Sequence, residues 1–409
     1  MAYVIIGNGV SGVSAAESIR QLDPAGRIVL IGDETETPYC RPMISLVLEG
    51  AVPADQLPIR ADNFYEQLGI EPVLGRRVDA IDVAQKIVRV GEDQEIPYSK
   101  LLIASGADPR PIKAQGLTLK NIFFMRTQAQ VRDMLEILPG ARRALVLGGG
   151  LVGFKAAYGL LRRGLDVTML IRSGYPLSMQ ADETAGGIVL QELHRKGLEV
   201  QVGTEVIAFE GNGSVREALL SNGDRISCDL VVVGKGVLPA LSFVPRENIA
   251  VDLGILIDPH MRTSAEDVYA AGDVAEGVDI ARKTRWVNAI WPEAVIQGRL
   301  AGMNMAGRPV AGKGSLGRNV IRIFDLDILT GGVVTPLEED GYDVYQAFDG
   351  RRNTYRKFVF EGDRLAGVVL VNDIEQGGVF LSLMSSETPV TGSKEKLLSP
   401  KFNVKQLIN

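Results

Sequence analysis

A strand–glycine–helix unit occurs twice in this chain, and the repeat limits the possible fold more than any other feature of the sequence. In the first copy, the apolar run Tyr3–Ile6 predicts a buried strand, and apolar residues with helical spacing follow Gly12. The glycines between them have the spacing GxGxxG, typical of a turn that holds dinucleotide phosphates at a helix N-terminus. The second copy begins with the apolar strand Ala144–Leu147. One such motif alone fits a tight turn without a ligand equally well, but two favour a pair of dinucleotide-binding units.

Each glycine of the first motif has its own expected role. Gly7 allows the tight turn, Gly9 lets the backbone approach a pyrophosphate, and Gly12 lets the helix pack close to the strand. The next predicted strand is followed by Asp33 and Glu34. An acidic side chain about 20 residues past the glycines is where an adenosine ribose is held, so one of these two carboxylates is the expected ribose ligand.

Length and charge exclude several classes of protein. The 409 residues are too many for one compact core, so we expect two or three domains. A net charge of −6 without a long basic run argues against a nucleic-acid partner. There is no apolar run of about 18 residues and no charged leader before the first strand, so we expect neither a membrane span nor a signal peptide.

The cysteine and histidine content limits the chemistry. The only cysteines, Cys40 and Cys228, lie far apart, which indicates a reducing compartment rather than a disulfide scaffold, and we expect a cytoplasmic protein. With two histidines in addition, a structural zinc or a Cys-ligated iron–sulfur cluster within this chain is close to excluded.

The composition changes near Leu316, where a third region begins. Alternating strands up to Leu365–Val371, starting with Ile321–Phe324, and a helix at about Ile374–Leu383 predict a small β-rich α+β domain. The residues after Ser385 have no clear period, so this tail is expected to be loose or to dock elsewhere.

Four elements then occur in a specific order along the chain. The two glycine motifs are each followed by a strand that ends in glycine, and a further strand ends in Gly272-Asp273, before Trp291-Pro292 and Gln297-Gly298. In this order the chain resembles the FAD-dependent pyridine nucleotide–disulfide oxidoreductases over its whole length. It looks most like the rubredoxin reductases and the flavin part of NADH-dependent nitrite reductases, as Pro38-Tyr39 and Arg41-Pro42 indicate.

The resemblance implies an α/β fold with two Rossmann-like, three-layer dinucleotide-binding domains of the glutathione-reductase type and a small C-terminal α+β domain. The FAD domain is expected from residues 1–112 and 244–318. The NAD(P) domain, residues 113–243, is inserted between them, and residues 319–409 form the C-terminal domain.

The resemblance also implies the site residues. Those expected at FAD are Gly7, Gly9, Val10, Ser11, Gly12, Asp33, Glu34, Arg41, Pro42, Ser105, Gly106, Gly272, Asp273, Trp291, Ala294 and Gln297. Those expected at NAD(P)H are Gly148, Gly150, Leu151, Val152, Gly153, Arg172 and Gly234. Asp273 would bond the ribityl or pyrophosphate part, and Ala294 and Gln297 would face the isoalloxazine. Trp291 fits the flavin edge and a buried structural role about equally.

Three positions depart from the family pattern. Cys40 lies two residues from where relatives carry a reactive cysteine, so a packing role is favoured and cysteine-dependent reduction is disfavoured. Many relatives have Glu where this chain has Lys155, and a lysine where it has Leu46. Our hypothesis is that Lys155 lies close to flavin N5 and the nicotinamide, and the alternative is a solvated lysine. Arg172 stands at the ribose position and fits a 2′-phosphate, but no second arginine follows, so the choice between NADH and NADPH stays open.

The expected function is that of an FAD-dependent oxidoreductase that exchanges hydride with NAD(P)H and passes electrons to or from a one-electron carrier. Rubredoxin, a ferredoxin, or an iron–sulfur or other metal-containing subunit of a larger complex would suit, and a homodimer is an alternative assembly. Competing interpretations are a direct reductase of O2 or a disulfide, and a flavin-dependent redox-sensing interaction protein. The basic run Arg351, Arg352, Arg356 and Lys357 fits a solvated hairpin face better than a docking site for an acidic carrier.

Overall fold

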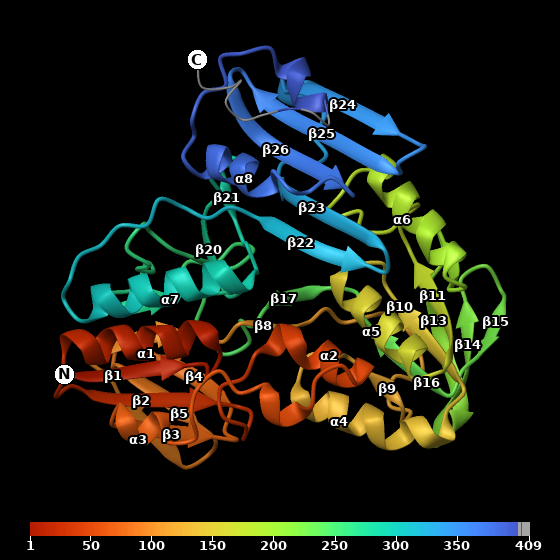
Figure 1. Ribbon diagram of the computed structural model, residues 1–409. Helices are drawn as coiled ribbons and strands as arrows, with labels where there is room; N and C mark the ends of the chain where they lie inside the picture. The colour runs from red at the N-terminus through yellow and green to blue at the C-terminus, as the bar shows by residue number, and fades with distance from the viewer. Residues whose placement is uncertain (400–401, 403–409) are drawn as a thin grey trace. The chain divides into compact units, whose positions relative to one another are not determined.

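The computed structural model describes residues 1–399 and 402 (Figure 1). By their contacts these residues form two compact units. The first unit comprises Met1–Pro42, Asp55–Asp108 and Leu238–Gly317, and the second Met43–Ala54, Pro109–Val237 and Arg318–Asn409. This grouping by contacts does not test the predicted bounds of three domains, which stay a prediction.

A five-stranded parallel sheet forms the centre of the first unit. Its strands, in spatial order, are β19 (Val268–Ala270), β7 (Lys100–Ile103), β1 (Ala2–Ile6), β2 (Arg27–Gly32) and β3 (Ile70–Leu74). β1 is apolar and buried because a parallel sheet is covered on both faces. The order places β1 between β7 and β2, so the loop after β1 opens at the carboxyl end of the sheet, where ligands bind in such folds.

Shorter elements complete the first unit. Two small sheets are β4 (Val78–Asp82) with β5 (Ile87–Val90) and β6 (Gln94–Pro97), and β18 (Ile255–Leu256) with β20 (Ala275–Val278) and β21 (Arg285–Trp286). The helix α3 spans Phe64–Gln67. Strands β8 (Ala107–Pro109) and β17 (Val237–Pro239) form a two-stranded sheet.

Two long helices of the first unit lie side by side, as Figure 1 shows for α1 (Val10–Leu22) and α7 (Trp291–Met305). Glycines allow this approach. A Cβ atom on Gly298 would lie 2.2 Å from the carbonyl oxygen of Ser11, and one on Gly302 would lie 2.4 Å from that of Ala15. The late helix is therefore held directly against the helix that follows the first glycine turn.

The second unit repeats the parallel-sheet architecture. The spatial order is β12 (Glu199–Val202), β11 (Asp166–Ile171), β10 (Arg143–Leu147), β16 (Leu230–Val233) and β9 (Ile122–Phe123). The helices of this unit include α2 (Ile44–Glu49), α4 (Gln128–Ile137), α5 (Leu151–Arg162) and α6 (Glu183–Arg195). The series β10–α5–β11 corresponds to β1–α1–β2 of the first unit, so the predicted repeat is confirmed.

A three-stranded antiparallel sheet lies between these strands in the sequence: β13 (Val206–Asn212), β14 (Ser214–Leu220) and β15 (Arg225–Ser227). A tight turn at Asn222-Gly223 joins β14 to β15 in a hairpin.

The C-terminal region forms an antiparallel sheet of its own, in the order β22 (Arg318–Ile323), β23 (Leu326–Gly332), β26 (Arg364–Val371), β25 (Thr354–Glu361) and β24 (Asp343–Asp349). The strand expected at Ile321–Phe324 ends at Ile323 because Phe324, with φ 52°, turns the chain. The helix expected from Ile374 is α8, Gly377–Ser385. In the tail, Phe402 is buried and stacks on Phe380, whereas residues 400–401 and 403–409 lie outside the described part.

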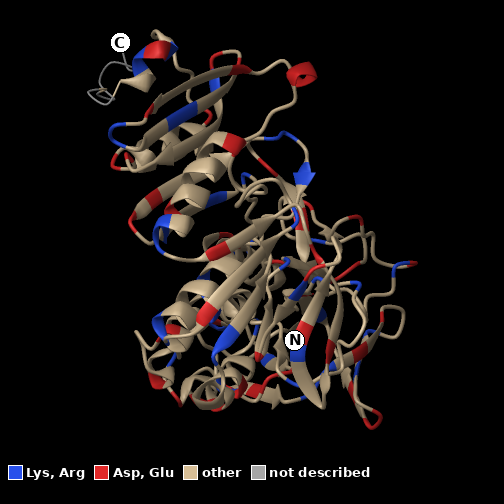
Figure 2. Cartoon of the chain, turned by 90° about the vertical axis from the view of Figure 1, so that its right-hand side faces the viewer, with Lys and Arg blue, Asp and Glu red and all other residues tan. Residues whose placement is uncertain are grey.

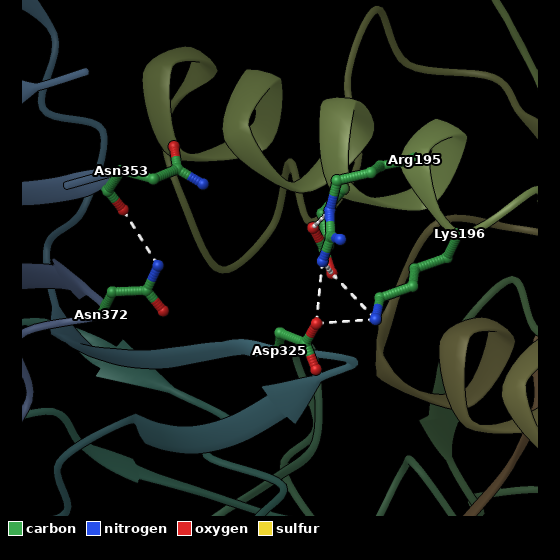
Figure 3. Close-up of polar contacts among 6 residues, drawn as sticks. Arg195, Lys196, Asp325, Asn353 and Asn372 are labelled. Carbon is green, nitrogen blue, oxygen red and sulfur yellow. Dashed lines mark hydrogen bonds and ion pairs between the residues drawn. The ribbon is translucent and has the colours of Figure 1, made fainter. Parts of the chain in front are cut away.

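Charged side chains join α6 to the C-terminal sheet. Asp325, in the turn between β22 and β23, accepts from Arg195 at 2.8 Å and from Lys196 at 2.6 Å (Figure 3). The buried carboxylate of Asp182, which caps α6, accepts from Tyr355 at 2.6 Å and from Lys357 at 2.8 Å.

These contacts correct the interpretation of the basic run as a solvated face or a docking site. Arg356 is 4% exposed and pairs with Asp373, and Lys357 is 6% exposed, so only Arg351 and Arg352 remain on the surface. The residue pattern of one strand does not show which of its side chains will contact a buried carboxylate on another element.

Figure 2 shows positive and negative residues interspersed along the side in view.

Candidate functional site

The three glycines of the first turn have different surroundings. A Cβ on Gly7 (φ 121°) would lie 2.0 Å from the carbonyl oxygen of Ala104, and one on Gly12 would lie 2.0 Å from that of Gly7. A Cβ on Gly9 would meet nothing within 4 Å. The outer glycines are therefore required by the protein's own backbone, whereas the middle one leaves open space at the start of α1.

Several predicted FAD residues of the first unit come together beside this space. Gly272 (φ 83°) is so close to Ser11 that a Cβ on it would lie 3.1 Å from the Ser11 Cβ and 3.7 Å from that of Ala294. The Gln297 amide oxygen accepts from the Gly272 N–H at 2.8 Å. Ser11 Oγ is buried and has no hydrogen-bond partner within residues 1–399 and 402.

The orphaned Ser11 hydroxyl gives a test of whether FAD fits. A buried hydroxyl without a partner is costly, and this one lies in the first turn of α1, two residues from Gly9. The first N–H groups of α1 have no partners within the helix and attract an anion. A pyrophosphate would satisfy both needs, so these residues fit the cofactor that the sequence implies.

The two acidic candidates for the ribose differ. The Glu34 carboxylate accepts from the Tyr39 hydroxyl at 2.6 Å and is paired with Arg41, whose guanidinium lies 5.1 Å from the centre of the Tyr39 ring. Glu34 thereby fixes the proline-bounded loop that ends at the exposed Pro42. Asp33, directly after β2, is exposed. This arrangement favours Asp33 as the ribose ligand and gives Glu34 a positioning role.

The remaining first-unit residues have mixed placements. Ser105 Oγ donates to the carbonyl of Ala240 at 3.0 Å, and the Gly106 carbonyl accepts from the Ala240 N–H at 3.1 Å. These two residues therefore hold a neighbouring loop. Asp273 and Trp291 are each half-buried, so a contact with a cofactor remains a prediction for both.

The second glycine turn repeats the geometry of the first. A Cβ on Gly148 (φ 111°) would lie 2.4 Å from the carbonyl oxygen of Gly234, and one on Gly153 would lie 1.9 Å from that of Gly148. A Cβ on Gly150 would meet nothing within 4 Å. Leu151 and Val152, half-buried, begin α5. In both motifs, therefore, the first and third glycines lie against backbone atoms, and the middle glycine has no neighbouring atom where a Cβ would be.

Three charged residues lie at the carboxyl edge of this second sheet. Arg172, directly after β11, is 80% exposed and lies 3.8 Å from Glu205, whose carboxylate is also 3.2 Å from the Lys235 ammonium. The sequence did not predict Glu205 as a site residue. Its only signal is an acid shortly after β12, the strand next to β11, whereas the acid of a ribose site is expected at the end of β11 itself.

Two of the positions that depart from the family pattern, Lys155 and Leu46, lie on helices that pack together in the second unit. Lys155 is exposed on α5, and Leu46 lies in α2. Arg163 Nε donates to the Leu48 carbonyl at 2.8 Å, and a Cβ on Gly159 would be 3.2 Å from the Leu48 side chain. The lysine of this chain, on α5, and the position at which relatives carry a lysine, on α2, therefore lie on neighbouring helices of the same unit.

The two cysteines differ in their surroundings. Burial raises the pKa of the Cys228 thiol to about 12, so it stays protonated. Cys40 is half-buried, and its N–H donates to the Leu57 carbonyl at 2.8 Å. Neither cysteine is in a disulfide.

None of the described helices is long and apolar enough to cross a membrane.

Two known protein families match most of the chain. The family described as pyridine nucleotide-disulphide oxidoreductase matches residues 1–298, and the rubredoxin NAD+ reductase C-terminal domain matches residues 318–388. The solved covalent complex of putidaredoxin reductase with putidaredoxin includes a chain that superposes with a TM-score of 0.90 at 26% identity, covering 100% of this chain and 98% of its own. The predicted fold class and the resemblance to this family are confirmed.

Curated relatives cover different shares of their own length. The assimilatory nitrate reductase electron transfer subunit of Bacillus subtilis is 26% identical over 97% of this chain and 51% of the relative. The NADH-dependent phenylglyoxylate dehydrogenase subunit epsilon of Aromatoleum evansii is 28% identical over 97% of this chain and 94% of the relative. The rubredoxin-NAD(+) reductase of Pseudomonas putida is 31% identical over 67% of this chain and 72% of the relative. The chain thus spans about half the length of the first of these three.

Proposed function

We propose that this chain, which belongs to the pyridine nucleotide-disulphide oxidoreductase family, is an FAD-dependent NAD(P)H oxidoreductase that exchanges electrons with a one-electron redox protein. The observation that carries the proposal is the matched pair of glycine turns, each with open space at its middle glycine. Relatives named as a rubredoxin reductase and as an electron transfer subunit support the same class of partner.

The first unit supplies the groups that would hold FAD. The N–H groups at the start of α1 and the Ser11 hydroxyl bind the pyrophosphate, and the Asp33 carboxylate accepts from the adenosine ribose. Gln297 fixes the Gly272 backbone and so keeps it close to Ser11. When bound, FAD accepts a hydride at N5 and can release its two electrons singly, which is the chemistry that the side chains here do not provide.

The second unit would bind and orient the nicotinamide nucleotide. The start of α5 receives its phosphates beside Gly150, and Arg172 lies at the ribose edge. Lys155, two residues past the last glycine of the turn, is assigned to the reacting end of the nucleotide. Its positive charge favours the more negative, reduced state of the bound cofactor.

An electron-carrier protein fits the chain better than a small substrate does. The Cys228 thiol is buried and protonated, and the sequence contains no CxxC or CxxxxC pair of the kind used in disulfide chemistry. A rubredoxin, a ferredoxin, or a metal-containing subunit of a larger complex is the proposed partner, in the cytoplasm. The chain acts as a homodimer or as one subunit of such a complex.

Steady-state turnover tests this function. The FAD-loaded chain is supplied with NADH or NADPH, and its rate is compared with rubredoxin, with a ferredoxin, and with O2 alone. Turnover at least about tenfold faster with a carrier than with O2 supports the proposal. Equal rates with and without a carrier would favour a direct oxidase instead.

A further inference from the structure

The ribose end of the second nucleotide site contains a carboxylate that is held in place by the fold. Glu205 follows β12, and its backbone is fixed on both sides by Ser221: the Ser221 N–H donates to the Glu205 carbonyl at 2.8 Å, and the Glu205 N–H donates to Ser221 Oγ at 3.3 Å. The carboxylate reaches Lys235 Nζ at 3.2 Å. Glu205 is therefore not a mobile surface acid.

The same carboxylate lies next to the side chain at the ribose position. Arg172 directly follows β11, where the residue that contacts the adenosine ribose is found in dinucleotide-binding folds. Its guanidinium is 3.8 Å from Glu205 and 80% exposed, so it is partly neutralised but open to a ligand.

Charge at this position decides between the two nucleotides. NADPH carries a 2′-phosphate where NADH has a hydroxyl. An arginine attracts that phosphate, a carboxylate repels it, and a carboxylate accepts a hydrogen bond from the free hydroxyl of NADH. The end of β11 lacks the usual acid, but Glu205 brings one to the same place from the neighbouring strand.

We infer that Glu205 is a specificity-determining residue that favours NADH over NADPH. It opposes a 2′-phosphate beside Arg172 and supplies the ribose acceptor that the Arg172 position does not. Lys235 holds its carboxylate there, and Ser221 holds its backbone. The inference rests on the proposed function, because it takes the second glycine turn as the site for the nicotinamide nucleotide.

The test uses Glu205→Gln, which keeps the backbone contacts with Ser221. Binding of 2′,5′-ADP and of 5′-AMP to the FAD-loaded chain is measured by calorimetry, and kcat/KM is measured for NADPH and NADH. We expect both ratios, phosphorylated over unphosphorylated, to rise about five- to tenfold, and the change to shrink in high salt. Glu210→Gln is the matched control because Glu210 also pairs with an arginine, Arg225 at 2.7 Å, and has no expected part in the site.

The outcomes separate this inference from the proposed function. Unchanged or lower ratios in Glu205→Gln, with flavin reduction by NADH intact, overturn the inference alone. A shifted 2′,5′-ADP to 5′-AMP ratio in a chain whose flavin neither nucleotide reduces overturns the proposed function alone. A wild-type chain that binds neither probe contradicts both.

Discussion

At the scale of single residues, the middle glycine of each GxGxxG turn differs from the first and third glycines in what a side chain there would meet. Gly7 and Gly12 are fixed by backbone atoms of the protein itself, whereas nothing within 4 Å of Gly9 in the described chain explains a glycine there. Because each of these open glycines lies at the start of a helix within a GxGxxG turn, our proposal is that a ligand is the reason for Gly9 and for Gly150.

This difference predicts opposite results for two substitutions. Gly9→Ala should leave the free energy of unfolding of the apoprotein within about 1 kcal/mol of wild type but lower FAD affinity about a hundredfold, because the methyl group occupies the place of the pyrophosphate. Gly12→Ala should destabilise the apoprotein by about 3 kcal/mol or more, because its methyl group meets the Gly7 carbonyl. Chemical unfolding and FAD titration measure both. Equal stability losses for the two variants would refute the assignment.

Lys155 gives the second prediction at this scale. Removal of its ammonium in Lys155→Ala should lower the flavin reduction potential and slow hydride transfer about tenfold, since a cation favours the reduced cofactor. Potentiometry and rapid mixing with NADH are the measurements. Lys113→Ala, an exposed lysine of the same unit, is the control, and Lys155→Arg should restore the potential. An unchanged potential in Lys155→Ala would leave only the solvated-lysine interpretation.

At the scale of elements, the contact between α1 and α7 links two segments that are far apart in the sequence. It brings Gly272, Ala294 and Gln297 close to Ser11 within the first unit. Periodicity predicted both helices. It did not predict the glycine contacts between them, because GxxxG spacing on α7 is read as an interface only once its partner is known.

Gly298→Ala tests this contact. A methyl group 2.2 Å from the Ser11 carbonyl forces the helices apart, so we expect a loss of stability of about 2–4 kcal/mol and weaker FAD retention. Gly187→Ala, in the middle of α6 with nothing within 4 Å of its Cβ, should be neutral or stabilise by up to about 1 kcal/mol. Thermal unfolding of the two variants compares them. A Gly298→Ala protein as stable as Gly187→Ala would contradict the packing argument.

At the scale of the whole molecule, one ion-pair cluster ties together two chain segments of the first unit. Asp267, just before β19, accepts hydrogen bonds from Lys86 at 2.6 Å and from Lys100. Hydrogen bonds from Lys100 and Lys86 lower the pKa of the Asp267 carboxyl below its ordinary value of 3.8. Since the folded pKa is depressed, the charged form stabilises the fold above the unfolded value, and this stabilisation is lost as pH falls through the folded value.

Asp267→Asn therefore has a pH-dependent effect. Asparagine tolerates the positive φ of 64° at this position, so the backbone is kept. We expect a loss of about 1 kcal/mol at neutral pH and no difference from wild type at a pH well below 3.8, where both side chains are uncharged. Urea unfolding at several pH values measures it. A difference that persists in acid would indicate a backbone effect instead.

The sequence predicted the repeated dinucleotide unit and the C-terminal α+β region because each depends on local patterns: glycine spacing, apolar strands and helical periodicity. It did not predict Glu205 beside Arg172, nor the burial of Arg356 and Lys357. These are contacts between elements far apart in the chain, and they are set by tertiary packing rather than by local pattern. The grouping of the segment Met43–Ala54 with the second unit likewise depends on tertiary contacts.

The central claim is that this chain takes a hydride from a nicotinamide nucleotide onto FAD and releases single electrons to a protein. Anaerobic double mixing tests it most directly: the FAD-loaded chain is first mixed with one equivalent of NADH or NADPH, then with an oxidised rubredoxin or ferredoxin, while flavin and carrier absorbance are followed. The account predicts loss of the flavin absorbance in the first step, no such loss in Gly150→Ala, and its return in the second step with two carriers reduced per flavin. Flavin absorbance that neither nucleotide changes, or that returns only on admission of O2, would contradict it.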